Sequence, residues 1–319
     1  MLLAVDSLDI ALSLPGGPRR VVRGVSFALD SGQSLGLVGE SGSGKTMTAL
    51  ALMGLLPDVA KVSGEIRFEG RDLARASEAE MQRVRGDRIS MVFQEPMTAL
   101  NPLHRVGDQI AEPLRLHRGH GLARARAEAV RLIERVRLRD PEKLARAYPF
   151  QLSGGERQRA MIAMALACSP KLLIADEPTT ALDVTVQARI LDLLAEFGAA
   201  SGLAILLVSH DLAVIARHCQ RVLVMYGGAV MEEGPVEAVL RLPLHPYTRA
   251  LLAARPQLGR PRERLAAIPG AGGAAVEGCA FSTRCPLALP ACREDPPAVA
   301  LADGHVVRCV RVTADGRLT

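Results

Sequence analysis

The chain has 319 residues, a formal net charge of +5 and 49% hydrophobic residues. A hydrophobic content near one half excludes a disordered chain, and so mild a charge does not by itself indicate nucleic-acid binding. No uninterrupted apolar run reaches the length of about 20 residues that spans a bilayer. The first residues include Asp6 and Asp9 and have no basic start, so they do not resemble a signal peptide. We therefore expect a cytoplasmic protein, in which disulfides are rare.

The N-terminal half begins with residues 2–12 and 19–29, which alternate apolar and polar side chains. This alternation predicts antiparallel strands joined by the turn at 15–18. Residues 34–40 predict a short buried strand, after which a helix opens near Gly44. From about residue 95 the pattern becomes helical, and residues 121–138 carry many arginines. We interpret that basic face as a solvated helix surface rather than a nucleic-acid contact.

The C-terminal half begins with two apolar runs, 171–177 and 203–211, that end in polar residues. Such runs are typical of parallel strands buried on both faces. A hairpin is predicted around Gly227 and Gly228, and a short helix after Pro235. The rest of the chain is a loop-rich tail with many prolines and glycines.

The segment from Gly39 to Thr46 matches the phosphate-loop pattern G-x-x-x-x-G-K-[ST], between a predicted strand and a predicted helix. Its glycines allow successive backbone N–H groups to face phosphate, and the helix N-terminus adds partial positive charge. Lys45 is one of only four lysines in an arginine-rich chain, which suits a compact charge between phosphates. The predicted nucleotide-binding residues are Gly39, Glu40, Ser41, Gly42, Ser43, Gly44, Lys45 and Thr46.

Two acidic residues end the apolar run at 171–177. Asp176 would lie at the carboxyl edge of a sheet, where ligands bind in α/β folds, and would hold Mg²⁺ together with the Thr46 hydroxyl. Glu177 follows directly and is positioned to orient or deprotonate an attacking water. The pattern predicts ATP and Mg²⁺ as ligands and ATP hydrolysis as the reaction.

The most specific motif is QLSGGERQR, from Gln151 to Arg159, in which Ser153, Gly154 and Gly155 precede a predicted helix. Here the chain resembles the ATP-binding-cassette (ABC) ATPases. In that family this signature faces the γ-phosphate held by the opposite subunit, so the resemblance implies action in trans.

Further motifs of the family occur in the expected order. Gln94 resembles the glutamine that senses Mg²⁺ and γ-phosphate, the segment Thr180–Asp183 resembles the D-loop, and His210 resembles the switch histidine. The resemblance therefore implies catalytic roles for Glu177, His210 and Gln94. One motif departs from the family: the position that usually stacks an aromatic on adenine falls near Leu12, so apolar contact would replace stacking.

The resemblance implies an α/β fold of the ABC type, a P-loop NTPase core with an antiparallel β subdomain and a helical subdomain at about 95–165. We expect this ATPase domain to span 1–240. An extension over 241–319 would follow, with a small loop-rich cysteine module.

Narrower signals lie in residues 93–110, in HPYTRALL at 245–252 and in the cysteine tail. They resemble the first of two paired ATPases in bacterial dipeptide, oligopeptide and nickel importers. The implied partners are a second ABC ATPase in a heterodimer, two membrane permeases and an extracytoplasmic binding protein, at the cytoplasmic face of the inner membrane. Importers of nickel or another small solute, or a soluble cassette acting on nucleic acid or ribosomes, are the alternatives. No nucleic-acid partner is expected.

Four of the six cysteines lie in the tail, at Cys279, Cys285, Cys292 and Cys309. Structural zinc usually uses cysteine pairs separated by about two to four residues, and these gaps are five, six and sixteen residues. Iron–sulfur clusters use four thiolates with varied spacing, and some importers of the branch that this tail resembles carry a [4Fe–4S] cluster there. The hypothesis is a cluster-bound module, with zinc or plain reduced cysteines as alternatives. Cys168 and Cys219 are interpreted as ordinary buried residues.

Overall fold

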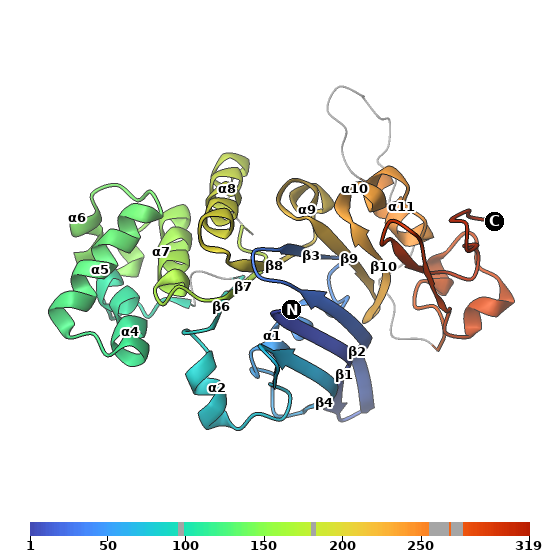
Figure 1. Ribbon diagram of the computed structural model, residues 1–319, viewed down its shortest axis with the longest axis horizontal. Coiled ribbons are helices and arrows are strands. Elements are labelled where there is room, and N and C mark those ends of the chain that lie inside the picture. Colours follow the sequence, from blue (N-terminus) through green and yellow to red (C-terminus); the bar gives the residue numbers. More distant parts are fainter. Residues whose placement is uncertain (95–98, 180–182, 255–267, 269–276) are drawn as a thin grey trace. The chain divides into compact units, whose positions relative to one another are not determined.

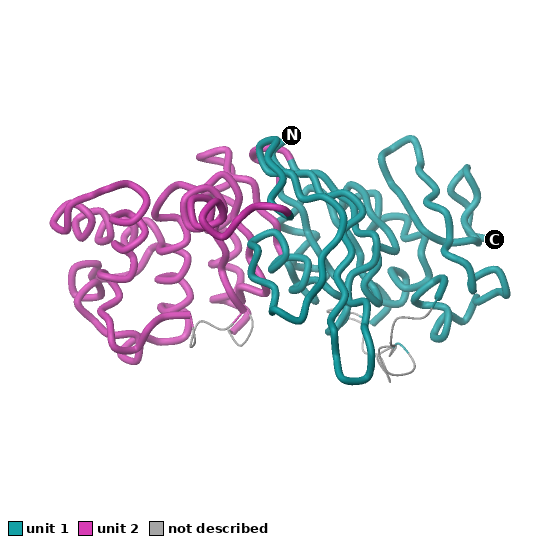
Figure 2. Tube along the Cα trace, turned by 90° about the horizontal axis from the view of Figure 1, so that it is seen from below, with its two compact units in different colours: residues 1–29, 34–74, 208–319 teal, residues 30–33, 75–207 magenta. Residues whose placement is uncertain are grey.

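The computed structural model describes residues 1–94, 99–179, 183–254, 268 and 277–319. The chain forms two compact units, each built from separate stretches of sequence (Figure 2). Unit 1 comprises residues 1–29, 34–74 and 208–319, and unit 2 comprises residues 30–33 and 75–207. Among the described residues, no helix combines the length and the hydropathy needed to cross a membrane.

Unit 1 begins with an antiparallel sheet in the strand order β2-β1-β4-β5 (Figure 1). Its strands are β1 (Leu3–Leu14), β2 (Gly17–Leu29), β4 (Ala60–Phe68) and β5 (Arg71–Asp72). Leu8 and Ile10 of β1 and Val22 and Val25 of β2 are fully buried on the inner face. The antiparallel N-terminal strands predicted from alternation are confirmed, because a two-faced sheet needs side chains that alternate with period two.

A second set of strands in unit 1 runs in the order β11-β12-β10-β9-β3. These strands are β3 (Ser34–Val38), β9 (Arg221–Tyr226), β10 (Ala229–Pro235), β11 (Ala298–Ala300) and β12 (Val306–Arg308). β3 and β9 are parallel, and the other pairs are antiparallel. The predicted hairpin at Gly227 and Gly228 joins β9 to β10.

The helices of unit 1 are α1 (Lys45–Leu52), α9 (Leu212–His218), α10 (Val236–Arg241) and α11 (Pro246–Ala253). Two 3₁₀ turns, Ser282–Arg284 and Pro290–Arg293, lie in the cysteine tail. α1 directly follows the segment after β3, which is the strand–loop–helix order that the phosphate-loop motif requires.

Unit 2 contains strands β6 (Ile89–Val92), β7 (Leu172–Asp176) and β8 (Ala204–Ser209) in the order β8-β7-β6. Every residue of the three strands is buried, and β6 and β7 are parallel. The prediction that the two apolar runs form fully buried strands is therefore confirmed. The chain passes from unit 2 into unit 1 within β8.

The helical part of unit 2 explains the change of pattern after residue 95. Its helices are α2 (Glu78–Val84), α4 (Val106–Arg118), α5 (Leu122–Arg135), α6 (Pro141–Arg146), α7 (Gly154–Leu166) and α8 (Val184–Ser201). α5 buries one stripe of Ala125, Ala129, Leu132 and Ile133. Its arginines lie on the exposed face. The interpretation of this face as a solvated surface rather than a nucleic-acid contact stays a prediction.

The C-terminal tail joins unit 1 through packing that the sequence pattern did not predict. β12 pairs with β10, so the tail extends a strand arrangement that begins in the ATPase core. Phe281 is 1% exposed, and its ring centroid lies 5.2 Å from that of Tyr226 on β9 and 5.3 Å from that of Tyr247 on α11. These contacts supply apolar packing that the loop-rich tail cannot provide alone.

Candidate functional site

The phosphate loop of unit 1 occupies the segment between β3 and α1. Lys45 is the first residue of α1 and is only 5% exposed. Its ammonium donates to the carbonyl oxygens of Gly39, at 2.8 Å, and Glu40, at 3.0 Å. The cation is therefore held by the loop at the helix N-terminus, where phosphate oxygens are favoured by the helix dipole.

Two glycines of this loop are required by close backbone approach. A Cβ on Gly39 would lie 2.1 Å from the carbonyl oxygen of Met225 on β9. Gly44 has a φ of +100°, and a Cβ there would lie 2.6 Å from the carbonyl oxygen of Val21. Any other residue would displace the loop from the strands beneath it.

The remaining loop residues differ in exposure. Ser41, Gly42 and Thr46 are exposed, whereas Ser43 is buried. Thr46 is the residue whose hydroxyl is predicted to bind Mg²⁺. The structure brings the eight predicted residues together in one loop; their roles toward nucleotide stay predictions.

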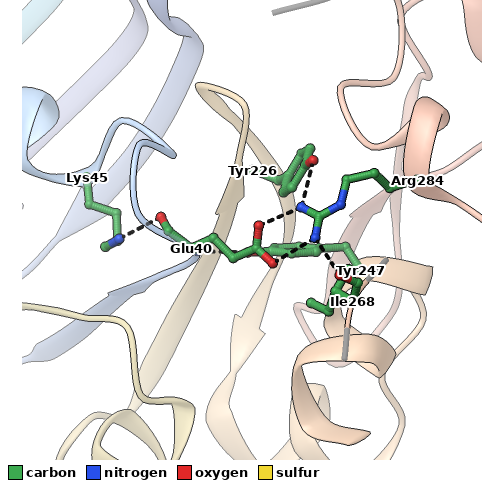
Figure 3. Close-up of polar contacts among 6 residues, drawn as sticks. All are labelled: Glu40, Lys45, Tyr226, Tyr247, Ile268 and Arg284. Carbon is green, nitrogen blue, oxygen red and sulfur yellow. Dashed lines mark hydrogen bonds and ion pairs between the residues drawn. The ribbon is translucent and has the colours of Figure 1, made fainter. Parts of the chain in front are cut away.

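Glu40 has partners that the sequence did not reveal (Figure 3). Its backbone N–H donates to the hydroxyl of Tyr247 at 2.8 Å. The Arg284 guanidinium donates to its carboxylate at 2.6 and 3.3 Å, and also to the Tyr226 hydroxyl at 3.0 Å and the Ile268 carbonyl at 3.0 Å. The available signals were the tyrosine of the HPYT segment and an arginine next to Cys285, but neither indicates a partner 244 positions away.

Two other predicted residues lie in other parts of unit 1. His210 follows β8 and is exposed. Leu12 is half-buried on β1, opposite Arg19 of β2 and Ala60 of β4. The roles of His210 toward γ-phosphate and of Leu12 toward adenine stay predictions.

Unit 2 carries the predicted acidic pair. Asp176 is the last residue of β7 and is 2% exposed. Glu177 has a φ of +45°, a left-handed conformation that non-glycine residues seldom adopt and that is often found at functional sites. The Gln94 side-chain amide donates to the Glu177 carboxylate at 3.3 Å. The structure thus brings together two of the three residues expected to be catalytic.

The signature sequence forms the start of α7 in unit 2. Ser153 is the N-cap, and Gly154 and Gly155 are the first two helical residues. Glu156 completes a capping box: its carboxylate accepts from the Ser153 backbone N–H at 2.9 Å, and its own N–H donates to the Ser153 hydroxyl at 3.4 Å. The Ser153 backbone N–H and the Ser153 hydroxyl both donate to this carboxylate and lower the pKa of Glu156, which therefore stays ionised.

A pocket of about 530 Å³ adjoins this helix start. Besides Ser153 and Glu156 it is lined by Arg137, Arg139, Arg159, Arg189, Val136, Leu138 and Leu193. Four arginines and the Glu156 carboxylate line this pocket, and Arg137 is paired with Glu196 at 2.6 Å. The action of the signature in trans stays a prediction. Of the D-loop, Thr180, Ala181 and Leu182 lie outside the described residues, while Asp183 caps α8 by accepting from the Val186 N–H at 2.9 Å.

The four tail cysteines are gathered in one region but are not arranged as metal ligands. Burial, with a smaller effect from the neighbouring Cys292, Cys309 and Cys285, raises the pKa of Cys279 to about 11. All four thiols are free. Within the described part of the chain, no three His, Cys, Asp or Glu side chains form a group that could hold a metal ion. The predicted iron–sulfur or zinc site is therefore not confirmed.

The phosphate loop on a strand–loop–helix unit, together with a buried strand ending in Asp176 and Glu177, defines a P-loop ATPase. A family model described as "ABC transporter" matches residues 22–180, and one described as "Oligopeptide/dipeptide transporter, C-terminal region" matches residues 231–292. The chain belongs to the ABC transporter family of ATP-binding proteins. Membership of this family agrees with the ATP hydrolysis that the sequence motifs predicted.

Three curated relatives align along nearly the whole chain. The probable peptide ABC transporter ATP-binding protein y4tR of Sinorhizobium fredii is 48% identical over 98% of this chain and 95% of its own length. The dipeptide transport ATP-binding protein DppD of Escherichia coli is 45% identical, over 97% and 96%. The oligopeptide transport ATP-binding protein OppD of Salmonella typhimurium is 46% identical, over 98% and 94%.

Solved structures confirm the cassette fold. The ATP-binding cassette MJ0796, solved as a dimer bound to ADP and Pi, superimposes with a TM-score of 0.66 at 28% identity and covers 74% of this chain and 99% of its own. A second dimeric structure of MJ0796, a bacterial ABC transporter cassette, gives a TM-score of 0.67 at 27% identity over the same shares.

Proposed function

We propose that the chain is the ATP-hydrolysing subunit of a bacterial importer of dipeptides or oligopeptides. The observation that carries the proposal is the match of residues 231–292 to the oligopeptide/dipeptide transporter C-terminal region. The names of the relatives from three bacteria, each at 45% identity or more, support the same class of cargo.

The residues present fit ATP with Mg²⁺. The loop N–H groups, the N-terminus of α1 and the buried Lys45 suit a polyphosphate, and the Thr46 hydroxyl suits Mg²⁺. Gln94 and Asp176 complete the proposed Mg²⁺ ligands. When bound, the cation neutralises charge that develops on the phosphates. Glu177 then positions or deprotonates the attacking water, and His210 contacts the γ-phosphate.

The proposed machine places the chain in a pair with a second ABC ATPase, below two permeases, at the cytoplasmic face of the inner membrane. An extracytoplasmic binding protein delivers the cargo. The dimeric MJ0796 structures support the pairing. A pocket of about 350 Å³ supports a permease contact, because Arg105, Asp108, Arg126, Glu142 and Arg146 of the α4–α6 region line it. Such a charged concave surface suits a short helix from another subunit.

Growth of a deletion strain tests the cargo. In a background that requires one amino acid, deleting the gene should abolish growth on a dipeptide or oligopeptide containing that residue, while growth on the free amino acid continues. The wild-type gene should restore growth, and Glu177→Gln should not. Unimpaired growth on peptides, with loss of nickel-dependent enzyme activity instead, would replace peptide import by nickel import.

The cysteine tail is proposed to bind a metal centre, an iron–sulfur cluster rather than zinc. The support is the four thiols in one short segment and their mutual effect on the pKa of Cys279. Since the described thiols are not arranged as metal ligands, the test is to measure the metal content of the purified protein. Anaerobically purified protein should contain iron and sulfide. Stoichiometric zinc would select the alternative, and protein without metal would exclude both.

A further inference from the structure

The Glu40 carboxylate lies within the phosphate loop, where a negative charge is unfavourable for binding phosphate. Glu40 is the second residue of a loop that is predicted to hold a polyphosphate, and an unneutralised anion there would repel it. The side chain is partly exposed, at 28%, so solvent only partly screens its charge. The loop itself offers little compensation, because the Lys45 ammonium contacts the Glu40 backbone carbonyl rather than its carboxylate.

Arg284 supplies the missing charge from the cysteine tail. Its guanidinium binds both carboxylate oxygens of Glu40, and its side chain is only 6% exposed. The orientation of this fork is held by two further acceptors, the Tyr226 hydroxyl and the Ile268 carbonyl. Figure 3 shows the Glu40 carboxylate directed toward Arg284, on the side away from Lys45. Such a bidentate, preorganised pair is stronger than an ordinary surface ion pair.

The backbone of Glu40 is also held by a hydrogen bond from the C-terminal extension. The Tyr247 hydroxyl, on α11, accepts the Glu40 N–H. Tyr247 is fully buried and packs against Tyr226, with ring centroids 4.7 Å apart. Two parts of the C-terminal extension therefore hold one residue of the nucleotide loop, one through the backbone and one through the side chain.

We propose that Arg284 is a positioning residue for ATP binding, which neutralises Glu40 and makes the affinity of the phosphate loop depend on the docked cysteine tail. The proposal rests on the ATP-binding role of the loop, not on the nature of the cargo. Peptide import could therefore fail its own test while this inference holds. ATP binding by the wild-type chain is measured first and tests the loop's role separately.

Charge removal in the purified full-length chain tests the proposal. Arg284→Gln leaves the Glu40 carboxylate without its partner, so the Kd for ATP should rise on the order of three- to tenfold. Raising the salt from about 0.05 M to about 0.5 M should reduce this loss, because screening weakens the repulsion. The Kd is measured by titration calorimetry, and folding is checked by circular dichroism and thermal unfolding.

A second substitution, at Glu40, shows whether Arg284→Gln weakens ATP binding through charge repulsion or through damage to the structure. Glu40→Gln in the Arg284→Gln background removes the stranded anion and leaves no net charge, as in the wild-type ion pair, so ATP affinity should return to within about twofold of wild type. A merely structural role for Arg284 would leave the double variant as weak as Arg284→Gln. That result, or an unchanged Kd in Arg284→Gln, would overturn the proposal.

An exposed arginine of the same tail provides the matched control. Arg293 follows Cys292 in the same tail and is exposed, so Arg293→Gln should leave the Kd for ATP unchanged.

If Arg284→Gln does not fold, Arg284→Lys keeps the positive charge but loses the two-pronged guanidinium. Affinity within about threefold of wild type in the lysine variant then supports charge neutralisation. A loss of tenfold or more in that variant contradicts it.

Discussion

Glu177 combines an unusual backbone with a defined side-chain partner. Its φ of +45° places it in a region that costs on the order of 1–3 kcal/mol for a non-glycine residue. The conformation turns the chain out of β7 directly after Asp176, and the Gln94 amide holds the carboxylate at 3.3 Å. A strained residue at the end of a buried strand is where a group that acts on water would be expected.

Glu177→Gln should keep ATP binding and lower turnover by about 10²–10⁴-fold, because the amide cannot accept the proton of the attacking water. ATP affinity and phosphate release are measured in the assembled transporter. Glu134→Gln, exposed on α5, serves as the control and should turn over normally. Near-native turnover in Glu177→Gln would remove this residue from the reaction.

His245 is a second residue whose environment sets its chemistry. Burial lowers the pKa of His245 to about 4, and the nearby Glu232 opposes this only in part. The neutral ring caps α11, since its Nδ1 accepts the Tyr247 N–H at 3.0 Å. Protonation would place a cation in a buried site and remove the acceptor.

Stability should therefore fall in mild acid. Because the folded pKa of about 4 lies below the unfolded value of 6.5, the unfolded chain binds more protons between these values. The free energy of unfolding should decrease as the pH falls through this window, by at most about 1.4 kcal/mol per pH unit from this group. Asn is also a good N-cap, so His245→Asn should retain the helix and flatten the slope in urea unfolding from pH 7 to 4.5. An unchanged slope would assign the effect to other groups.

At the scale of elements, a buried carboxylate attaches the extension to the core. Glu232 lies on β10 and is 1% exposed. It accepts the N–H groups of Leu244, at 2.7 Å, and His245, at 3.0 Å, before α11. His305, just before β12, lies 2.7 Å away through Nε2. One side chain thus joins a core strand, a helix start and the tail.

Glu232→Ala should destabilise unit 1 by about 2–5 kcal/mol, because it leaves three buried polar groups without their acceptor. Glu232→Gln retains one acceptor oxygen and should cost less. Glu237→Ala, exposed on α10, is the control and should stay near wild type. Urea unfolding measures the three variants. Equal stability of Glu232→Ala and Glu237→Ala would show that the carboxylate does not hold the elements together.

At the scale of the whole molecule, the signature and the phosphate loop belong to different units of the chain. Ser153 caps α7 in unit 2, and Lys45 begins α1 in unit 1. The cassette MJ0796, which this chain resembles, was solved as a dimer. In the pairing proposed above, each chain would contribute to two nucleotide sites. A single subunit should then hydrolyse ATP poorly.

A mixed dimer tests that partnership. Ser153→Ala in this chain, paired with a partner whose phosphate-loop lysine is replaced, should retain hydrolysis at the Lys45 site. The same substitution also removes an N-cap, at a cost of about 1 kcal/mol, so thermal unfolding must confirm that the chain stays folded. Ser153→Thr keeps the cap and is the matched control. Equal loss at both nucleotide sites would contradict action in trans.

The sequence by itself determined the features that arise from local periodicity and short motifs. Alternation predicted β1 and β2, continuous apolar runs predicted β7 and β8, and a 3.6-residue period predicted α5. The loop from Gly39 to Thr46 was equally local, since its glycines, lysine and hydroxyl must be close in sequence to surround one ligand.

Only the tertiary structure decided how the C-terminal tail relates to the nucleotide loop. The sequence predicted a small loop-rich cysteine module and indicated no contact between it and the phosphate loop, because a loop-rich segment has no period that identifies its partners. The structure instead joins Glu40 to Arg284, 244 positions apart, and Glu232 to His305, 73 positions apart. Such pairs form because the tertiary fold places distant residues next to each other. A local sequence pattern does not indicate which distant residues will be in contact.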